Sequence, residues 1–153
     1  MLTRFLAVMV LGLTLSARAA DDSSDAGQVA ETFFNSYVKA QPEFHNGYES
    51  VIAWVKASPL VTEAYKKAIA KLYRDALRQD PEGGYGSDAV IGGQDSPDHF
   101  KAKKCKVTGD TAEVMLFGDD PFPMKVRVFL VRTGGKWLID KSGALLPGDG
   151  PGQ

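Results

Sequence analysis

The groups that could carry out acid–base chemistry gather in one short stretch, residues 92–100, which read GGQDSPDHF. It contains Asp95, Asp98 and His99, and His99 is one of only two histidines in the chain. A carboxylate buried at such a place can act as a general base, because loss of solvent raises its pKa. One hypothesis is therefore an acid–base site in which Asp95 is the base and His99 or Tyr85 is the assisting acid.

A metal site is a second interpretation of the same stretch, since Asp95, Asp98 and His99 are three possible ligands. The two carboxylates stand three positions apart and could converge on an ion if the segment turned. The sequence has neither an HExxH motif nor cysteine and histidine at zinc-site spacing, and a calcium loop would supply more oxygen ligands. We therefore expect no metal and no other cofactor.

The third interpretation, which we favour, is architectural. Asp95 would accept backbone N–H groups as in an Asx-turn, Pro97 would hold the turn, and Phe100 would begin the packing of the first strand. Gln94 would bridge the loop backbone to the helices. The residues expected to line a ligand site at this corner are Tyr85, Gln94, Asp95, Asp98, His99 and, from the inward face of the sheet, Arg127.

The N-terminal residues, MLTRFLAVMVLGLTLSARA, are typical of a secretory signal peptide. Arg4 is followed by an uncharged run over residues 5–15, and small residues stand at Ala17 and Ala19. The apolar run is well short of the roughly 20 residues that a bilayer core requires. We expect residues 1–19 to be removed by cleavage after Ala19, which would leave a mature chain in the periplasm or outside the cell.

Composition limits the classes of partner. The chain has 18 basic and 19 acidic residues, so its net charge gives no reason to expect nucleic acid or an anionic membrane as a partner. Removal of 19 of the 153 residues would leave 134, enough for one ordinary domain.

Cys105 is the only cysteine, which excludes an internal disulfide bond. Strand alternation predicts Lys103, Cys105 and Val107 on one face, with Cys105 as a small apolar filler. The flanking lysines could instead lower the pKa of the thiol and make it reactive.

Helices are expected in the first half of the chain, after a flexible leader at residues 20–27. Residues 28–41 repeat apolar side chains at helical spacing, among them Phe33 and Tyr37. Residues 48–57 favour a shorter helix, although this apolar run could equally be a strand. Ser58 as N-cap and Pro59 at the first helical position predict a third helix up to about residue 79. Its expected buried stripe is Val61, Tyr65, Ile69, Leu72 and Ala76.

The second half predicts a sheet. Residues 82–97 are rich in glycine and form a joint, and strands follow from Phe100, Thr111, Met124 and Lys136, with a Gly134-Gly135 hairpin turn. Period-two alternation places Ala112, Val114, Leu116, Val126, Val128 and Leu130 on one face. The opposite face would carry Met115, Phe117, Phe129 and Val131 and could form a homodimer.

The order of elements predicts an α+β fold in which N-terminal helices pack on a curved C-terminal antiparallel sheet. We expect a single domain over residues 28–142, with a cavity at its open end, and a disordered tail over residues 143–153.

Four short stretches resemble a bacterial exported family of unknown function. They are FFNSY at 33–37, SPLV at 58–61, GQDSPDHF at 93–100 and GKWLID at 135–140. The resemblance covers about residues 28–142 and implies the cystatin-like cone fold of nuclear transport factor two and ketosteroid isomerase. Gly93 replaces a commoner alanine, and Phe100 stands where relatives often have tryptophan.

The resemblance brings no catalytic residues that can be transferred. Ketosteroid isomerase uses an aspartate base with a tyrosine and a protonated aspartate. Asp95, Asp98 and Tyr85 supply these residue types, but their spacing does not support the same geometry.

The function that we expect is an exported, non-catalytic binding module for a protein or a small molecule in the cell envelope. One specific form is an immunity-like inhibitor that neutralises a toxin. The alternative is a small hydrolase or isomerase with Asp95 as its base.

Overall fold

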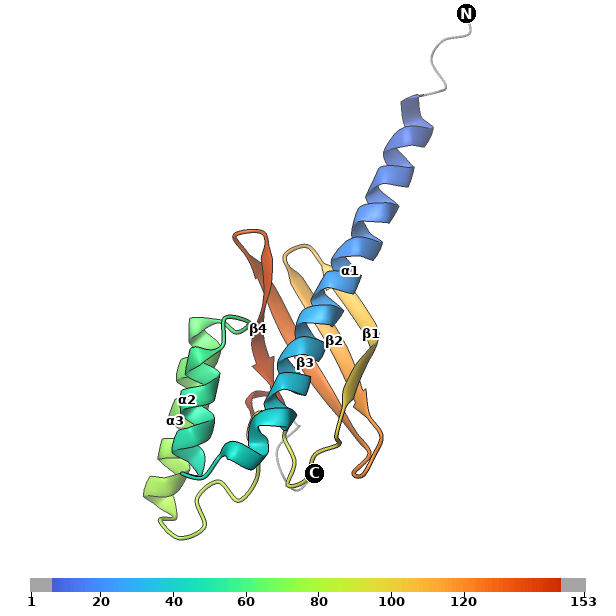
Figure 1. The fold of residues 1–153 in the computed structure, drawn as a ribbon. Helices are drawn as coiled ribbons and strands as arrows, with labels where there is room; N and C mark the ends of the chain where they lie inside the picture. Colours follow the sequence, from blue (N-terminus) through green and yellow to red (C-terminus); the bar gives the residue numbers. More distant parts are fainter. Residues whose placement is uncertain (1–6, 147–153) are drawn as a thin grey trace, which may run out of the picture.

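The computed structural model describes residues 7–146, with side chains from residue 21 onward. Its elements are α1 (Ala7–Ala40), a 3₁₀ turn (Gln41–Glu43), α2 (Tyr48–Ala57), α3 (Glu63–Gln79), β1 (Phe100–Thr108), β2 (Thr111–Gly118), β3 (Met124–Thr133), β4 (Lys136–Ser142) and a second 3₁₀ turn (Gly143–Leu145). The strands form one antiparallel sheet in the order β1-β2-β3-β4, and the helices lie on one side of it (Figure 1). The predicted α+β fold is confirmed.

The two faces of the sheet differ as the alternation predicts. The side chains on the face toward the helices are buried: Ala112, Val114 and Leu116 of β2 and Val126, Val128 and Leu130 of β3. The intervening residues of both strands point to the opposite face, which we call the outer sheet face, and they are only partly buried. Apolar burial is therefore concentrated on the helix side.

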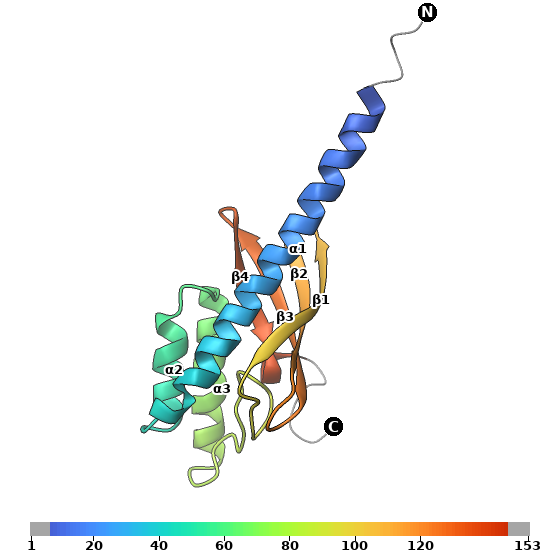
Figure 2. The same ribbon diagram turned by 45° about the vertical axis from the view of Figure 1, so that its right-hand side comes forward.

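Helix α1 lies across the inner face of the sheet, with α2 and α3 beside it (Figure 2). The ring of Phe34 packs edge-on against that of Phe100 in β1, with centroids 5.6 Å apart. Phe33 packs against Tyr65 of α3 and Trp54 of α2, at 6.2 and 5.3 Å. One helix thus joins the sheet to the other two helices through aromatic contacts.

Polar side chains of α1 also bind the first residues of β1. The Asn35 side chain accepts a hydrogen bond from the Phe100 N–H at 2.7 Å and donates one to the Phe100 carbonyl at 3.0 Å. Glu31 accepts the Ala102 N–H at 2.5 Å. Since β1 is at the edge of the sheet, these bonds satisfy backbone groups that would otherwise lack a partner strand.

A bulge in β1 changes the predicted strand faces. The pairing with β2 shifts between Ala102 and Lys104, so the extra residue is Lys103. Ala102, Cys105 and Val107 are partly buried, while the Lys103 ammonium lies 5.2 Å from the Phe117 ring on the outer sheet face. The prediction that Lys103 shares a face with Cys105 and Val107 is wrong, because strict alternation does not continue across a bulge.

The predicted flexible leader at residues 20–27 is helical and belongs to α1. Ala26 is fully buried, and Asp22 forms an ion pair with Arg132 of β3 at 2.8 Å. These contacts explain why a polar, acidic segment continues the helix. Across the part of the chain that the structure describes, no helix has the length and apolar character needed to cross a membrane.

The predicted disordered tail at residues 143–153 is ordered at its start. Residues 143–145 form a 3₁₀ turn, and Leu146 is buried. Residues 147–153, like residues 1–6 of the predicted signal peptide, lie outside the described residues.

The helix predicted over residues 48–57 is confirmed, and the next helix begins later than Ser58 and Pro59 indicate. Ser58 ends α2, and Thr62 caps α3 by accepting the Tyr65 N–H at 3.0 Å. Between the two helices, Val61 forms a parallel bridge with Ile139 of β4. This pairing needs extended backbone, so it overrides the local helix-start signal.

We predict that Asn35→Ala lowers the free energy of unfolding by about 1–3 kcal/mol, because it leaves the Phe100 N–H without its acceptor. The control is Ser36→Ala at the neighbouring exposed position, which should change stability by less than about 0.5 kcal/mol. Urea denaturation followed by circular dichroism measures both. Equal midpoints for the two variants would contradict the role given to Asn35.

Candidate functional site

The joint between the helices and the sheet is organised around the half-buried carboxylate of Asp88. One oxygen accepts the Tyr37 hydroxyl at 2.5 Å and the Gln41 side-chain amide at 3.1 Å. The other accepts the backbone N–H groups of Val90 and Ile91 at 2.8 and 3.2 Å. The turn is closed by a backbone bond from the Asp88 N–H to Gly93.

Four donors therefore hold Asp88 in place. Burial, and next the negative charge of Asp88, raise the pKa of the Tyr37 phenol, so the phenol stays protonated and donates. Asp88 performs the Asx-turn role that we predicted for Asp95. The usable signal was an aspartate directly before the apolar residues Ala89, Val90 and Ile91 in a glycine-rich segment.

Those three apolar residues fill the space between helices and sheet. Ala89, Val90 and Ile91 are all buried, and the Tyr73 hydroxyl of α3 accepts the Ala89 N–H at 2.8 Å. The Ser142 hydroxyl of β4 donates to the Val90 carbonyl at 3.0 Å. The joint is thus a plug fixed to α3 and β4, and it occupies the place where we expected a cavity.

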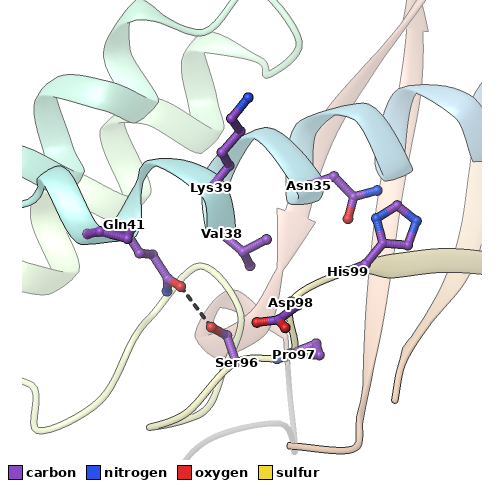
Figure 3. A pocket seen from close by; sticks show the side chains of 9 residues that line it. Asn35, Val38, Lys39, Gln41, Ser96, Pro97, Asp98 and His99 are labelled. Atoms are coloured by element: carbon purple, nitrogen blue, oxygen red, sulfur yellow. Dashed lines mark hydrogen bonds between the residues drawn. The ribbon is translucent and has the colours of Figure 1, made fainter. Parts of the chain in front are cut away.

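A pocket of about 560 Å³ lies at the surface beside this plug, between the end of α1 and the segment before β1 (Figure 3). The residues that line it are Asn35, Val38, Lys39, Gln41, Pro42, Ser96, Pro97, Asp98 and His99. The Ser96 hydroxyl donates to the Gln41 side-chain carbonyl at 2.8 Å. Gln41 therefore bridges helix and loop, the role that we predicted for Gln94.

Asp98 and His99 both line this pocket but do not form a pair. The Asp98 carboxylate points toward Ser96, while the His99 ring lies beside Asn35 (Figure 3). Both side chains are exposed, and the backbone N–H of Asp98 donates to Asp120 in the turn after β2. This geometry does not let His99 relay a proton to or from Asp98.

The other predicted site residues lie elsewhere. Asp95 is exposed and is not among the residues that line the pocket. Gln94 donates to Gly86 at 3.4 Å and borders a second pocket, of about 410 Å³, beside α2 and α3. Tyr85 packs edge-on against Tyr73 with centroids 6.0 Å apart, and burial raises the pKa of its phenol.

The prediction that Arg127 lines the inward face is wrong. The inward positions of β3 are Val126, Val128 and Leu130, so Arg127 belongs to the outer sheet face. There its guanidinium lies 5.8 Å from the centre of the Phe129 ring. The alternation of β3 in the sequence already carried this information.

Within residues 21–146, no group of three or more histidine, cysteine, aspartate or glutamate side chains is placed to hold a metal ion. Asp95, Asp98 and His99 lie on an irregular segment with bends at Asp95 and Asp98, and they form no such group. The predicted site therefore does not exist as one unit. Asp98 and His99 line a surface pocket, whereas residues 89–91 form the buried plug.

The sequence matches no protein-family model and no curated protein. Among solved structures, the fold is similar to a chain in the crystal structure of the type VI native effector–immunity complex Tae3–Tai3 from Ralstonia pickettii. The TM-score is 0.50 at 20% sequence identity, and the alignment covers 76% of this chain and 91% of that chain. At this identity the similarity concerns the fold.

Cys105 lies on the side of β1 that faces α1 and is half-buried. Burial raises the pKa of its thiol. Hydrogen bonds with the Ser23 side chain and the Gly27 backbone lower the pKa and only partly offset this effect. The neighbouring lysines point to the outer sheet face, so they do not activate the thiol.

We predict that replacing Asp88 with Asn lowers the free energy of unfolding by about 1–3 kcal/mol, because the new amide places donors against Tyr37 and Gln41. Asp95→Asn is the matched control and should stay within about 0.5 kcal/mol of the wild type. Thermal and urea unfolding compare the two. A larger loss of unfolding free energy for Asp95→Asn than for Asp88→Asn would mean that Asp95 stabilises the turn, as the sequence predicted.

We predict that Cys105 reacts slowly with a thiol reagent at pH 7–8. Its labelling rate should increase only at a higher pH than the labelling rate of an ordinary thiol does. The sign follows from the raised pKa, because less thiolate is present at a given pH. The measurement compares labelling rates over a pH series for the folded chain and for the chain in denaturant. Faster labelling of the folded chain at neutral pH would mean that the lysines activate the thiol.

Proposed function

We propose that this protein is exported to the periplasm and acts there as an immunity-like inhibitor that binds a partner protein without catalysing a reaction. The observation that carries the proposal is the similarity of fold to a chain from an effector–immunity complex, which extends over 91% of that chain. The assignment to the cystatin-like cone family of exported proteins is part of the same proposal. FFNSY lies in α1 and GKWLID leads into and forms most of β4.

The interior of the domain supports recognition at the surface. Ala89, Val90 and Ile91 occupy the space between helices and sheet, and both oxygens of Asp88 are occupied, one by Tyr37 and Gln41 and the other by Val90 and Ile91. A substrate would therefore have to react on an open surface, where Asp98 and His99 point apart. A filled interior with an open surface suits the binding of a protein partner better than the enclosure of a substrate.

Export fits the way α1 packs. The expected cleavage site after Ala19 precedes Asp22, which forms an ion pair with Arg132 of β3. Cleavage there would leave the packing of Ala26, Phe33 and Phe34 in place.

The test is to express the full chain with a C-terminal affinity tag in its native cells and to isolate it from the periplasmic fraction. The mature chain should begin at Ala20 and should retain one protein in stoichiometric amount. After purification the two should form a complex with a dissociation constant of about 1 µM or lower. A tagged periplasmic protein of similar size is the control. Recovery of the chain from the cytoplasm, or without a partner beyond that control, would contradict the proposal.

A further inference from the structure

The outer sheet face is the one side of the sheet that α1, α2 and α3 leave uncovered (Figures 1 and 2). The pairing of the strands places its residues in rows. Lys101 and Lys125 flank Phe117 in one row, and Lys104 and Arg127 flank Met115 in the next.

Basic residues dominate this face, although the chain as a whole has a formal net charge of −1. The basic residues that the strand register and the β1 bulge place there are Lys101, Lys103, Lys104, Lys106, Lys125, Arg127, Lys136 and Lys141. Two acidic residues accompany them among the described residues: Glu113 pairs with Lys106 and Phe129, and Asp140, at the bulge of β4, accepts the Thr62 hydroxyl at 2.8 Å. Charge is thus separated in the fold in a way that the composition does not reveal.

Three of these basic groups lie near aromatic rings. The ammonium groups of Lys103 and Lys125 lie 5.2 and 5.3 Å from the centre of the Phe117 ring, and the Arg127 guanidinium lies 5.8 Å from that of Phe129. Such contacts restrict long side chains before any partner arrives, which lowers the entropy lost on binding. Aromatic rings, methionine and arginine are also the residue types enriched in protein interfaces.

Two common features of folded proteins would produce part of this charge pattern without a partner. Lysines on an edge strand such as β1 prevent pairing with other sheets, but this does not account for Lys125 and Arg127 on the interior strand β3. Charged helix surfaces are common, but on α3 four of the five basic residues have an acidic partner within α2 and α3, namely Lys66, Lys71, Arg74 and Arg78.

We propose that the outer sheet face is the partner-binding surface and that it receives an acidic patch on the partner protein. This inference rests on the proposed function and adds the location and the chemistry of the contact. An excess of cations around half-buried apolar residues is complementary to a partner that brings carboxylates at its rim and apolar groups at its centre.

A second copy of this chain fits less well, because it would oppose two faces of like charge. An anionic membrane also fits less well. Phe122 is the large apolar side chain that is most exposed among the described residues, and it follows Asp119 and Asp120, which such a membrane would repel. Both remain outcomes that the experiment distinguishes.

The first measurement is photo-crosslinking in the native cells with the full, tagged chain. The photo-reactive residue p-benzoylphenylalanine replaces Lys104 or Lys125 on the outer sheet face and, as control, Lys67 on α3, all of which are exposed. We expect crosslinks from the two sheet positions to the protein that the tag retains, in a segment where Asp and Glu outnumber Lys and Arg. The position on α3 should give none.

The second measurement compares two charge-reversed chains with the same formal charge. One carries Lys103→Glu, Lys104→Glu and Lys125→Glu, and the control carries Lys56→Glu, Lys67→Glu and Lys71→Glu. All six lysines are exposed, so both chains should fold, which circular dichroism and urea unfolding verify. The dissociation constant of the purified complex should rise about tenfold or more for the sheet variant and less than about twofold for the control.

The outcomes separate the two proposals. If the tag retains a partner but crosslinks arise only from α3, or the α3 variant binds more weakly than the sheet variant, this inference fails and the proposed function stands. Crosslinks from the sheet to lipid or to a second copy of the chain would also overturn it. If the tag retains no partner at all, the proposed function itself fails.

Discussion

Helix α1 both packs against the start of β1 and hydrogen-bonds to its backbone, and the rest of the structure depends on these two interactions. Phe34 must be buried against Phe100, and the backbone groups of Phe100 and Ala102 must find partners at an edge where no strand supplies them. Burial of an aromatic side chain contributes about 1.5–3 kcal/mol, and a buried N–H without an acceptor costs a similar amount. Apolar packing alone would not suffice, so Glu31 and Asn35 supply the hydrogen bonds from the same helix.

This arrangement limits where the proposed partner could bind. The inner face of the sheet is occupied by α1, and the opening at its end is filled by Ala89, Val90 and Ile91. The surfaces left for recognition are the pocket beside His99 and the outer sheet face. Only the latter combines apolar area with an excess of one charge, which is the reason for placing the protein contact there.

The elements that could be predicted from the sequence are those whose conformation follows from a single local pattern of apolar residues. Alternation in β2 and β3 identified the buried faces, and helical spacing identified the apolar face of α1 that includes the buried Phe33 and Tyr37. Prediction failed where contacts distant in sequence override a local signal. Ser58 and Pro59 are a good helix start, but the bridge from Val61 to Ile139 delays the helix.

The prediction of the candidate site was wrong for the same reason. Which aspartate forms the turn depends on Tyr37 and Gln41, which lie about 50 residues away in the sequence. The charge of the outer sheet face was also hidden, since lysines from β1 and β3 meet only through pairing with β2.

Amide hydrogen exchange of the folded chain tests most directly the claim that α1 closes the edge of β1. The N–H groups of Phe100 and Ala102 should exchange only through global unfolding, as slowly as those in the centre of β3, because Asn35 and Glu31 hold them. Exchange as fast as that of the exposed turn at Gly109 would contradict the account, since β1 would then have an open edge and α1 would be packed by its apolar side chains alone.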